Sequence, residues 1–437
     1  MIRLLRRFAP KPIVSLYHFF LAFLGAVRYG FPSKKLIVVG VTGTKGKTTV
    51  TELINTILEV AGYKTAVLNS ARFKIGDAKQ PNTTGTTMPG RFFIQKFLRD
   101  AADQRCRYAI IEVTSQGIIQ HRHRFIDFDS AILTNLAPEH IEAHGSFEKY
   151  RRSKLKLFRS LMKSRKPRRV AILNGDDKNF LYFRERLKLR EVLLFTAKAV
   201  KEYQEKADEM QFVFDRLRIT MNSFGQCNLE NALAAIAFAR SRDIPMGIIC
   251  DGLTKFSGVP GRFEFVQRSP FAVIVDYAHT PDSLSAIYAA VKRLQENGNL
   301  NLITNFHEPG TRFLCVLGAS GGGRDAWKRP LMGKIASDFC DEIMLTTEDP
   351  HDEDPEKIIK DIRTGVNPAV SGVLDVYEVV DRKKAIAMAI RHARPGDAVI
   401  ITGKGSEPWM FLAKGQKIPW SDKETARGAI DKQEMNS

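Results

Sequence analysis

The segment Gly40 to Thr49 combines glycines, a lysine and threonines in a pattern that could bind phosphate. Its sequence, GVTGTKGKTT, follows a short apolar run and opens a helical pattern. In this context backbone N–H groups approach phosphate oxygens at the positive end of a helix. Lys47 would reach the β- and γ-phosphates of a nucleotide, and the Thr48 hydroxyl would bind Mg²⁺. Val41 stands where the first glycine of the usual phosphate loop belongs, so an ordinary strand–turn–helix corner is the alternative, which Gly-Lys-Thr-Thr argues against.

The length and charge of the chain indicate the kind of protein that carries this loop. A chain of 437 residues is too long for one ordinary core and predicts two or three domains. The formal net charge of +19 and the pI of about 9.7 favour anionic partners such as nucleotides, nucleic acid or an acidic membrane surface. A nucleic-acid-binding ATPase rests on charge alone, because no motif interleaves aromatic and basic residues. The five cysteines form no C-x-x-C pair, so we expect no disulfide framework, no zinc site and a reducing compartment.

The N-terminus carries Arg3, Arg6 and Arg7 ahead of an apolar stretch at residues 13–27. A signal peptide, a membrane anchor and an amphipathic helix are the three interpretations. The stretch is short for a spanning helix, which needs about 20 apolar residues, and no convincing cleavage site precedes Arg28. We therefore expect a helix that docks on the protein or lies at a membrane surface, in a protein that stays in the cytoplasm with its ATP.

Apolar runs and helical patterns alternate along the chain. Such alternation predicts parallel sheets covered on both faces by helices. In the first half, strands are expected at residues 36–41, 65–68, 108–113, 131–134 and 170–173, helices at 47–61 and 228–240, and a hairpin at 211–220. In the second half, strands are expected at 272–275, 313–317, 342–345, 376–379 and 398–401, and helices at 281–295, 330–339, 355–362 and 382–392.

These elements predict an α/β fold of two domains behind a short N-terminal segment. Residues 1–34 form an apolar and basic helical segment, residues 35–267 a central ATP-binding domain with a parallel sheet, and residues 268–437 a Rossmann-like, doubly wound α/β domain. The stretch 297–311, rich in Asn and Gly, is expected to be a mobile surface insertion.

With its phosphate loop, the chain resembles the Mur ligases of cell-wall synthesis, whose loop has this variant spacing. The MurE type, which adds the third residue of the peptidoglycan stem peptide, is the most similar. Further motifs follow in the family's order: Asn82-Thr83-Thr84, Glu112-Val113-Thr114-Ser115, Thr134-Asn135-Leu136, Glu139-His140, and residues 150–154, 258–262, 276–282, 321–333 and 403–407. The resemblance covers residues 36–427.

The resemblance implies ATP-dependent formation of an amide bond through an acyl phosphate, with a muramyl peptide linked to a uridine nucleotide as one substrate and an amino acid as the other. It implies Mg²⁺, with two ions expected, a carbamylated lysine at Lys154, and a monomer. The implied catalytic residues are Lys47, His140, Lys154 and Arg262. The implied metal ligands are Thr48, Glu112, His140 and Lys154.

The nucleotide contacts follow from the same motifs. The implied ATP-binding residues are Gly43, Thr44, Lys45, Gly46, Lys47, Thr48, Thr49, Asn228, Asn231, Arg262, Asp276 and His279. The implied substrate-binding residues are Asn82, Thr83, Thr84, Thr114, Arg122, Arg329, Asp349, His351, Gly403 and Glu407.

Several positions depart from the family pattern. Gln116 replaces a histidine, and Glu139 replaces the aspartate that precedes the metal-binding histidine. His351 stands where diaminopimelate-adding enzymes carry an arginine, and Asp349 replaces an asparagine, which would favour an amine-ended side chain such as lysine. Arg324 or Arg329 could instead supply the missing charge. The roughly 35 residues before the first strand leave no room for the family's uridine-nucleotide domain.

Two further functions remain open at this point. The same mechanism could act on a non-muramyl acid of the folate or polyamide type, although residues 276–282 and 328–330 favour the muramyl side. A non-catalytic scaffold that binds nucleotide and a membrane is the third reading, against which the intact Lys47, Glu112, His140 and Lys154 argue.

Overall fold

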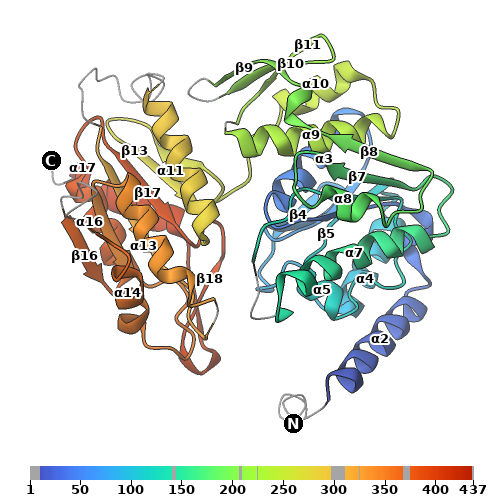
Figure 1. Cartoon of the computed structure of the whole chain (residues 1–437), viewed down its shortest axis with the longest axis horizontal. Coiled ribbons are helices and arrows are strands. Elements are labelled where there is room, and N and C mark those ends of the chain that lie inside the picture. The colour runs from blue at the N-terminus through green and yellow to red at the C-terminus, as the bar shows by residue number, and fades with distance from the viewer. Residues whose placement is uncertain are drawn as a thin grey trace. The chain divides into compact units, whose positions relative to one another are not determined.

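The structure is a computed structural model of the whole chain. It describes residues 10–139, 144–205, 209–223, 225–296, 311–323, 325–367 and 375–435 (Figure 1). The predicted catalytic residue His140, Arg324 and nearly all of the expected insertion at 297–311 lie outside these residues. Contacts divide the chain into unit 1, Met1–Gln204 with Met210–Ser257, and unit 2, Glu205–Glu209 with Gly258–Ser437. The boundary after residue 267 stays a prediction about domains that fold separately.

Unit 1 is built on an eight-stranded sheet in the order β4-β3-β2-β5-β1-β6-β7-β8. The strand that precedes the phosphate loop, β1, lies at its centre, parallel to β5 and β6. A short antiparallel pair, β3 and β4, extends one edge. The strands are β1 (Ile37–Thr42), β2 (Thr65–Leu68), β3 (Arg72–Ile75), β4 (Ala78–Pro81), β5 (Tyr108–Glu112), β6 (Ser130–Leu133), β7 (Val170–Asn174) and β8 (Glu191–Phe195).

Helices cover both faces of this sheet because its central strands are apolar on both sides (Figure 1). Val38, Ala66 and Ala109 point to the face where α4 and α7 pack, while α3 packs against the sheet together with α9 and α10. The helices are α2 (Lys11–Arg28), α3 (Lys47–Val60), α4 (Arg91–Asp103), α5 (Ser115–Ile119), α7 (Phe147–Lys163), α8 (Phe180–Arg184), α9 (Gln226–Arg240) and α10 (Met246–Thr254).

Two smaller parts complete this half of the chain. The strands β9 (Lys201–Glu205), β10 (Met210–Phe214) and β11 (Leu217–Met221) form an antiparallel sheet, and β10 and β11 form the hairpin expected at residues 211–220. The helix α2 lies at the edge of unit 1 beside α4 (Figure 1). Within the described parts of the chain, neither α2 nor another helix has the length and hydropathy needed to cross a membrane.

Unit 2 is a six-stranded sheet in the order β12-β13-β17-β14-β15-β16. All neighbouring strands are parallel except the edge strand β12. The strands are β12 (Glu264–Gln267), β13 (Ala272–Asp276), β14 (Phe313–Leu317), β15 (Glu342–Thr346), β16 (Asp375–Val379) and β17 (Ala398–Thr402), with a separate pair β18 (Trp409–Phe411) and β19 (Lys417–Pro419).

The helices of unit 2 form two groups. The helices α16 (Arg382–His392) and α17 (Asp422–Met435) pack in one apolar cluster with alternate residues of the central strands. The helices α11 (Pro281–Glu296), α13 (Lys328–Phe339) and α14 (Pro355–Arg363) pack against one another. This is the doubly wound α/β arrangement that the sequence predicts. One bound was wrong, because α13 begins at Lys328, before the proline at which the helix was expected to start.

One expectation about the cysteines is also wrong. Cys315 in β14 and Cys340 after α13 form a disulfide, with Cα atoms 6.1 Å apart. They are 25 residues apart in the sequence, so their spacing could not reveal a pairing that only the packing of α13 on the sheet creates. Cysteine spacing therefore gives no argument for a reducing compartment.

Candidate functional site

The phosphate loop connects β1 to α3 as predicted. Gly46 precedes the first helical residue with φ of 79°, and among the described residues no side chain caps this helix start. The N–H groups of its first turn therefore face outward, where an anion can accept them. The loop is also closely packed, because a Cβ on Gly46 would lie 2.1 Å from Asn231 Oδ1 and one on Gly43 would lie 1.8 Å from Thr134 Oγ1. Neither glycine tolerates a side chain without displacing these neighbours.

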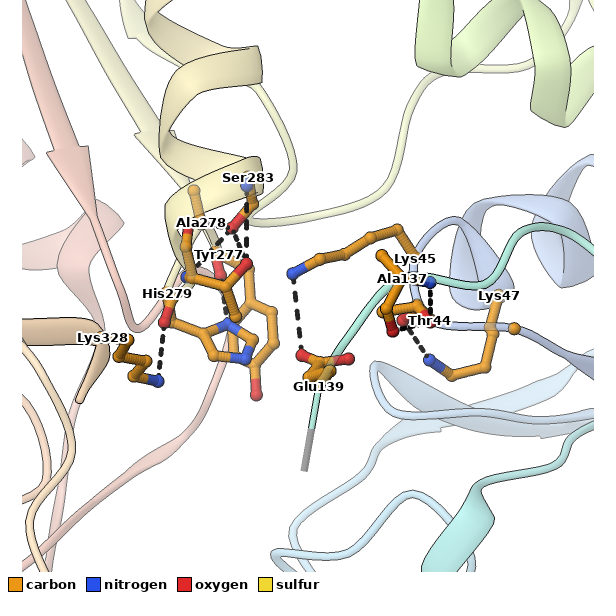
Figure 2. Close-up of polar contacts among 12 residues, drawn as sticks. Thr44, Lys45, Lys47, Ala137, Glu139, Tyr277, Ala278, His279, Ser283 and Lys328 are labelled. Carbon is orange, nitrogen blue, oxygen red and sulfur yellow. Dashed lines mark hydrogen bonds and ion pairs between the residues drawn. The ribbon is translucent and has the colours of Figure 1, made fainter. Parts of the chain in front are cut away.

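Hydrogen bonds from the loop after β6 hold the phosphate loop in shape. Asn135 accepts the N–H of Thr44 through its carbonyl (2.9 Å) and that of Lys45 through its side chain (2.8 Å). The Thr44 hydroxyl also exchanges hydrogen bonds with Ala137 (Figure 2) and lies 3.1 Å from the buried Tyr150 hydroxyl. Burial raises the pKa of Tyr150, so this phenol stays protonated. The motif that begins at residue 150 thus supports the loop directly, a role the sequence did not show.

Thr48 and Glu112 meet at the carboxyl ends of β1 and β5. The Thr48 hydroxyl donates to Glu112 Oε2 at 2.9 Å, and that oxygen also accepts the N–H of Ser70 at 3.0 Å. Lys47 Nζ lies 4.0 Å from Glu112 Oε1 and donates to the carbonyl of Thr44 (Figure 2). The Lys47 side chain is only 17% exposed, so most of its stem is covered by the protein.

This oxygen pair fits Mg²⁺. Proteins bind Mg²⁺ through one or two carboxylates, while waters and the phosphates of the substrate supply its other ligands. In the described part of the chain no group of three or more His, Cys, Asp and Glu side chains could hold a metal alone. Thr48 and the buried Glu112 would therefore hold the ion beside the phosphate loop. Ser70, which the sequence analysis missed, orients the carboxylate.

We expect Glu112→Gln to raise the Mg²⁺ concentration needed for half-maximal turnover by about ten- to a hundredfold, because a ligand loses its charge while its shape remains. The measurement is ATP turnover across a magnesium titration, with thermal unfolding as the control for stability. A variant with an unchanged magnesium dependence would remove Glu112 from the metal site.

Lys154, on α7, is buried against the same loop. Its Nζ donates to the carbonyl of Gly43 at 2.6 Å, and the residue is 1% exposed. Burial, and then the charge of Lys47, hold the pKa of this amine well below its usual range, while Glu139 and Glu112 act in the opposite direction. An amine in this position is unprotonated far more readily than a surface lysine, and an unprotonated amine is a nucleophile.

Lys45 and Glu139 form an ion pair at the mouth of the loop, with Nζ and Oε1 3.7 Å apart (Figure 2). Glu139 thus contacts the phosphate loop directly. The resemblance, in which Glu139 only replaces the family's aspartate, did not predict this contact. The remaining nucleotide residues of unit 1, Thr49 and Asn228, lie on α3 and α9. The Asn228 side chain accepts a hydrogen bond from Asn231 at 3.3 Å, and Asn231 lies next to Gly46.

The predicted substrate residues of unit 1 are less closely grouped. The buried Asn82 shapes the turn that follows β4, donating to the carbonyls of Asn69 and Thr86 and accepting from Thr84. Thr83 and Thr84 are exposed. Thr114 caps α5 by accepting the N–H of residue 117. Arg122 donates to the side chain of residue 120, within the segment that supports α2.

In unit 2, Arg262, Asp276 and His279 surround the end of β13. The Arg262 guanidinium lies over the ring of Tyr277, 4.2 Å from its centre. Asp276 accepts the N–H groups of residues 263 and 278 at 2.7 Å, so its carboxylate shapes the turn. His279 lies 2.8 Å from the carbonyl of Tyr277 through Nδ1, and its own carbonyl accepts from Lys328 (Figure 2).

A network of hydrogen bonds and ion pairs runs from Tyr277 to the predicted amino-acid site. The Tyr277 hydroxyl donates to Glu407 at 2.8 Å, and Lys404 Nζ donates to Glu407 at 2.6 Å and to both carboxylate oxygens of Asp349 at 2.9 Å. Lys404 is fully buried. Asp349 is thus already ion-paired within the protein, so its charge alone gives no argument for an amine-ended side chain. Gly403 (φ of 113°) leaves room for the Glu348 carboxylate, which a Cβ would approach to 2.8 Å.

Arg329 and His351 differ in what they can offer a substrate. Arg329 is 1% exposed and donates to Glu353 and Asp361 and to a backbone carbonyl. Its charge is thus neutralised within the protein, and this argues against Arg329 as the replacement for the family's arginine. His351 has φ of 53°, and its ring stacks on Phe411 with centroids 5.6 Å apart.

Comparison with known proteins agrees with this arrangement. Residues 41–239 match the family model described as "Mur ligase middle domain", and residues 261–405 match "Mur ligase, glutamate ligase domain". The chain is 36% identical over 419 residues to UDP-N-acetylmuramoyl-L-alanyl-D-glutamate--2,6-diaminopimelate ligase of Syntrophomonas wolfei, covering 93% of this chain and 80% of that protein. It is 34% identical to UDP-N-acetylmuramyl-tripeptide synthetase of Roseiflexus sp., covering 94% and 81%.

Several solved structures are also similar to this chain. A structure of a UDP-N-acetylmuramoyl-L-alanyl-D-glutamate--2,6-diaminopimelate ligase is 28% identical, with a TM-score of 0.59 and 91% of this chain and 79% of that one covered. Folylpolyglutamate synthase of Mycobacterium tuberculosis, at 15% identity and a TM-score of 0.68, covers 90% and 93% and shares the fold alone. The two family models and the relatives define the class of protein, an ATP-dependent ligase. The chain belongs to the Mur ligase family.

Proposed function

We propose that this ligase joins an amino acid to the peptide of a UDP-N-acetylmuramyl acceptor in peptidoglycan synthesis. The observation that carries the proposal is the grouping of Lys47, Thr48 and Glu112 around an uncapped helix start, with Lys154 buried behind the loop. The names of the relatives supply the acceptor and the range of amino acids, diaminopimelate or a similar one such as lysine. We further propose that the enzyme works in the cytoplasm as a monomer.

The proposed reaction has two steps. A carboxylate oxygen of the acceptor peptide attacks the γ-phosphorus of ATP, ADP leaves, and an acyl phosphate forms. The amine of the incoming amino acid then attacks the acyl carbon, losing a proton as phosphate leaves with the former carboxylate oxygen. Bound Mg²⁺ neutralises the phosphates so that the acceptor carboxylate can approach. Lys47 and the α3 amides hold the phosphates in place, while Thr48 and Glu112 hold the ion.

We propose that Lys154 acts as a carbamate. The unprotonated, neutral Nζ attacks the carbon of CO₂ and loses one proton, so a side chain that is a cation in its protonated form becomes an anion. The support is its burial, its lowered pKa and the influence of the charge of Lys47 on it. A neighbouring cation disfavours the ammonium form and favours the anionic carbamate. The carbamate could bind a second Mg²⁺, for which His140 is the other proposed ligand.

In unit 2 we propose Arg262, Asp276 and His279 as nucleotide contacts, and Gly403 and Glu407 as contacts of the α-amino end of the amino acid. Asn82, Thr83, Thr84, Thr114 and Arg122 are the proposed contacts of the acceptor. The function is tested by phosphate release with purified UDP-muramyl peptides and a panel of amino acids. Turnover with a folate or polyamide acid, and none with any muramyl peptide, would favour the second candidate, which shares the fold.

The choice of amino acid gives a separate prediction at His351. A neutral imidazole lacks the charged fork of the arginine that clamps a distal carboxylate, and Arg329 is already paired. We therefore expect lysine to compete with diaminopimelate for the same acceptor, and His351→Arg to shift the ratio toward diaminopimelate by about ten- to a hundredfold. The measurement is competition at equal concentrations, with His351→Ala as the control. A strong preference for diaminopimelate that survives in His351→Ala would show that this position does not set the choice.

A further inference from the structure

The inner face of α2 is fixed to unit 1. Ser15 Oγ lies 2.8 Å from His121 Nε2, and the ring of Phe19 packs on that of Phe125 with centroids 5.2 Å apart. Gly25 allows close approach to α4, because even a Cβ there would meet backbone atoms of residues 91 and 92 at 3.5 Å. The helix is thus held in one rotation about its axis, and the direction of its other side is fixed.

The other side of α2, here called the outer face, is apolar and open. It contains no charged residue, since residues 12–27 include none. Its large side chains recur at helical spacing on one side, opposite the buried His18, Ala22 and Ala26. The outer face comprises Ile13, Leu16, Tyr17, Phe20, Phe23, Leu24 and Val27, each between 40% and 59% exposed.

Basic side chains also lie near α2, on other elements. Arg124, Lys156 and Arg159 form what we call the basic cluster, and within the described residues none of the three forms an ion pair with a carboxylate. Burial lowers the pKa of Lys156, and the charges of Arg124 and Arg159 add to that effect. Burial lowers the pKa of His121, the residue that binds Ser15, to about 4, and the charges of Arg124 and Lys156 add to this effect. Arg124 adjoins Phe125 in the sequence, and the ring of Phe125 packs on those of Phe19 and Phe23, so the cluster lies near α2.

We propose that the outer face of α2 docks on a lipid bilayer surface rich in anionic headgroups, with the basic cluster in contact with those headgroups. An amphipathic helix with aromatic and aliphatic residues on one face and cations around it binds such a surface lying in its plane. The opposite end of α2 also carries positive charge, because Arg28, Lys34 and Lys35 are exposed there. Arg3, Arg6 and Arg7 add further positive charge in the sequence before the helix.

The charges favour lipid over a groove on another protein. Apolar grooves that take a helix need no surplus of cations on the elements flanking it, whereas an anionic bilayer attracts every basic residue within a Debye length. The docking is independent of the ligase reaction, so it can be tested without substrate. A second copy of this chain is the competing occupant, and the test includes it.

The test is flotation of the full chain with vesicles of phosphatidylcholine and phosphatidylglycerol, and with vesicles of phosphatidylcholine alone. We expect binding to the anionic vesicles that weakens as salt rises. The triple variant Leu16→Gln, Phe20→Gln, Leu24→Gln should lose binding. The variant Arg124→Gln, Lys156→Gln, Arg159→Gln should bind about a hundredfold more weakly. Both should keep the wild-type ATP turnover in the absence of lipid.

The matched control is the double variant Leu181→Gln, Leu194→Gln, which removes two side chains of unit 1 that are 55% and 50% exposed but lie away from α2. It should float like the wild type. Failure of the full chain to float with anionic vesicles would overturn the proposal, as would equal flotation of the outer-face variant. So would light scattering that shows a dimer which only the outer-face variant dissociates.

Discussion

Replacing Lys47 by alanine is expected to lower ATP turnover by about a hundred- to a thousandfold or more. The ammonium group is the point charge placed to stabilise the β- and γ-phosphates as charge moves during phosphoryl transfer, and loss of one such group costs a factor of this size. The fold should remain, because among the described residues the Lys47 side chain donates to the carbonyl of Thr44, a bond worth about 1 kcal/mol, and its ion pair with Glu112 is long, at 4.0 Å. Phosphate release and circular dichroism are measured on the same preparation.

The control for the Lys47 variant is Lys198→Ala, which removes an exposed lysine of the same unit and should leave turnover unchanged. This pair of variants separates a specific phosphate contact from a general loss of positive charge. A folded Lys47→Ala protein with wild-type turnover would refute the assignment of the phosphate loop.

Replacing Lys154 by alanine is expected to reduce ligation by about a hundredfold or more, with partial rescue by short carboxylic acids. Removing the side chain removes the carbamate anion, and acetate or formate can enter the vacated space and supply an anion in its place. Lys154→Arg should be equally inactive without rescue, because a guanidinium stays protonated and fills the site. Lys163→Ala, at the end of the same helix, should behave like the wild type. The assay is product formation across a titration of the acid.

The Lys154 variants also decide between a chemical and a structural role. Loss of activity with no rescue by any acid, accompanied by a lowered melting temperature, would make Lys154 a packing residue. Electron density that ends at an unmodified amine in a Mg-nucleotide complex prepared with adequate CO₂ would likewise count against the carbamate.

The sequence predicted the central strands and the phosphate loop because their signals are local. The apolar runs at residues 65–68 and 108–113 became β2 and β5, and Gly46-Lys47-Thr48 lies at the start of α3 as its spacing indicates. Asn228 and Asn231, three residues apart, predicted that both would lie on one side of a helix. In the structure the Asn231 side chain lies against Gly46, where a Cβ would come within 2.1 Å of its Oδ1.

The sequence could not show contacts between residues that are distant in the chain. The strands β3 and β4 have four residues each, and β4 is exposed throughout, so neither gives a signal long enough to predict a strand. Lys404 pairs with Asp349 across 55 residues, and this removed the support for a charge argument built on Asp349 alone. Ser70 supports Glu112 through a backbone N–H, for which residue type gives no signal.

The central claim, amide formation through an acyl phosphate on a muramyl peptide, is tested most directly by isotope transfer. The acceptor UDP-muramyl dipeptide is labelled with ¹⁸O in the carboxylate to be activated, and the ligase is supplied with ATP, Mg²⁺ and lysine or diaminopimelate. Mass spectrometry then reads the released phosphate and the peptide product together. The account predicts one ¹⁸O atom in each phosphate, formed in step with the new amide. Product with unlabelled phosphate, or phosphate release without any peptide product from either amino acid, would contradict it.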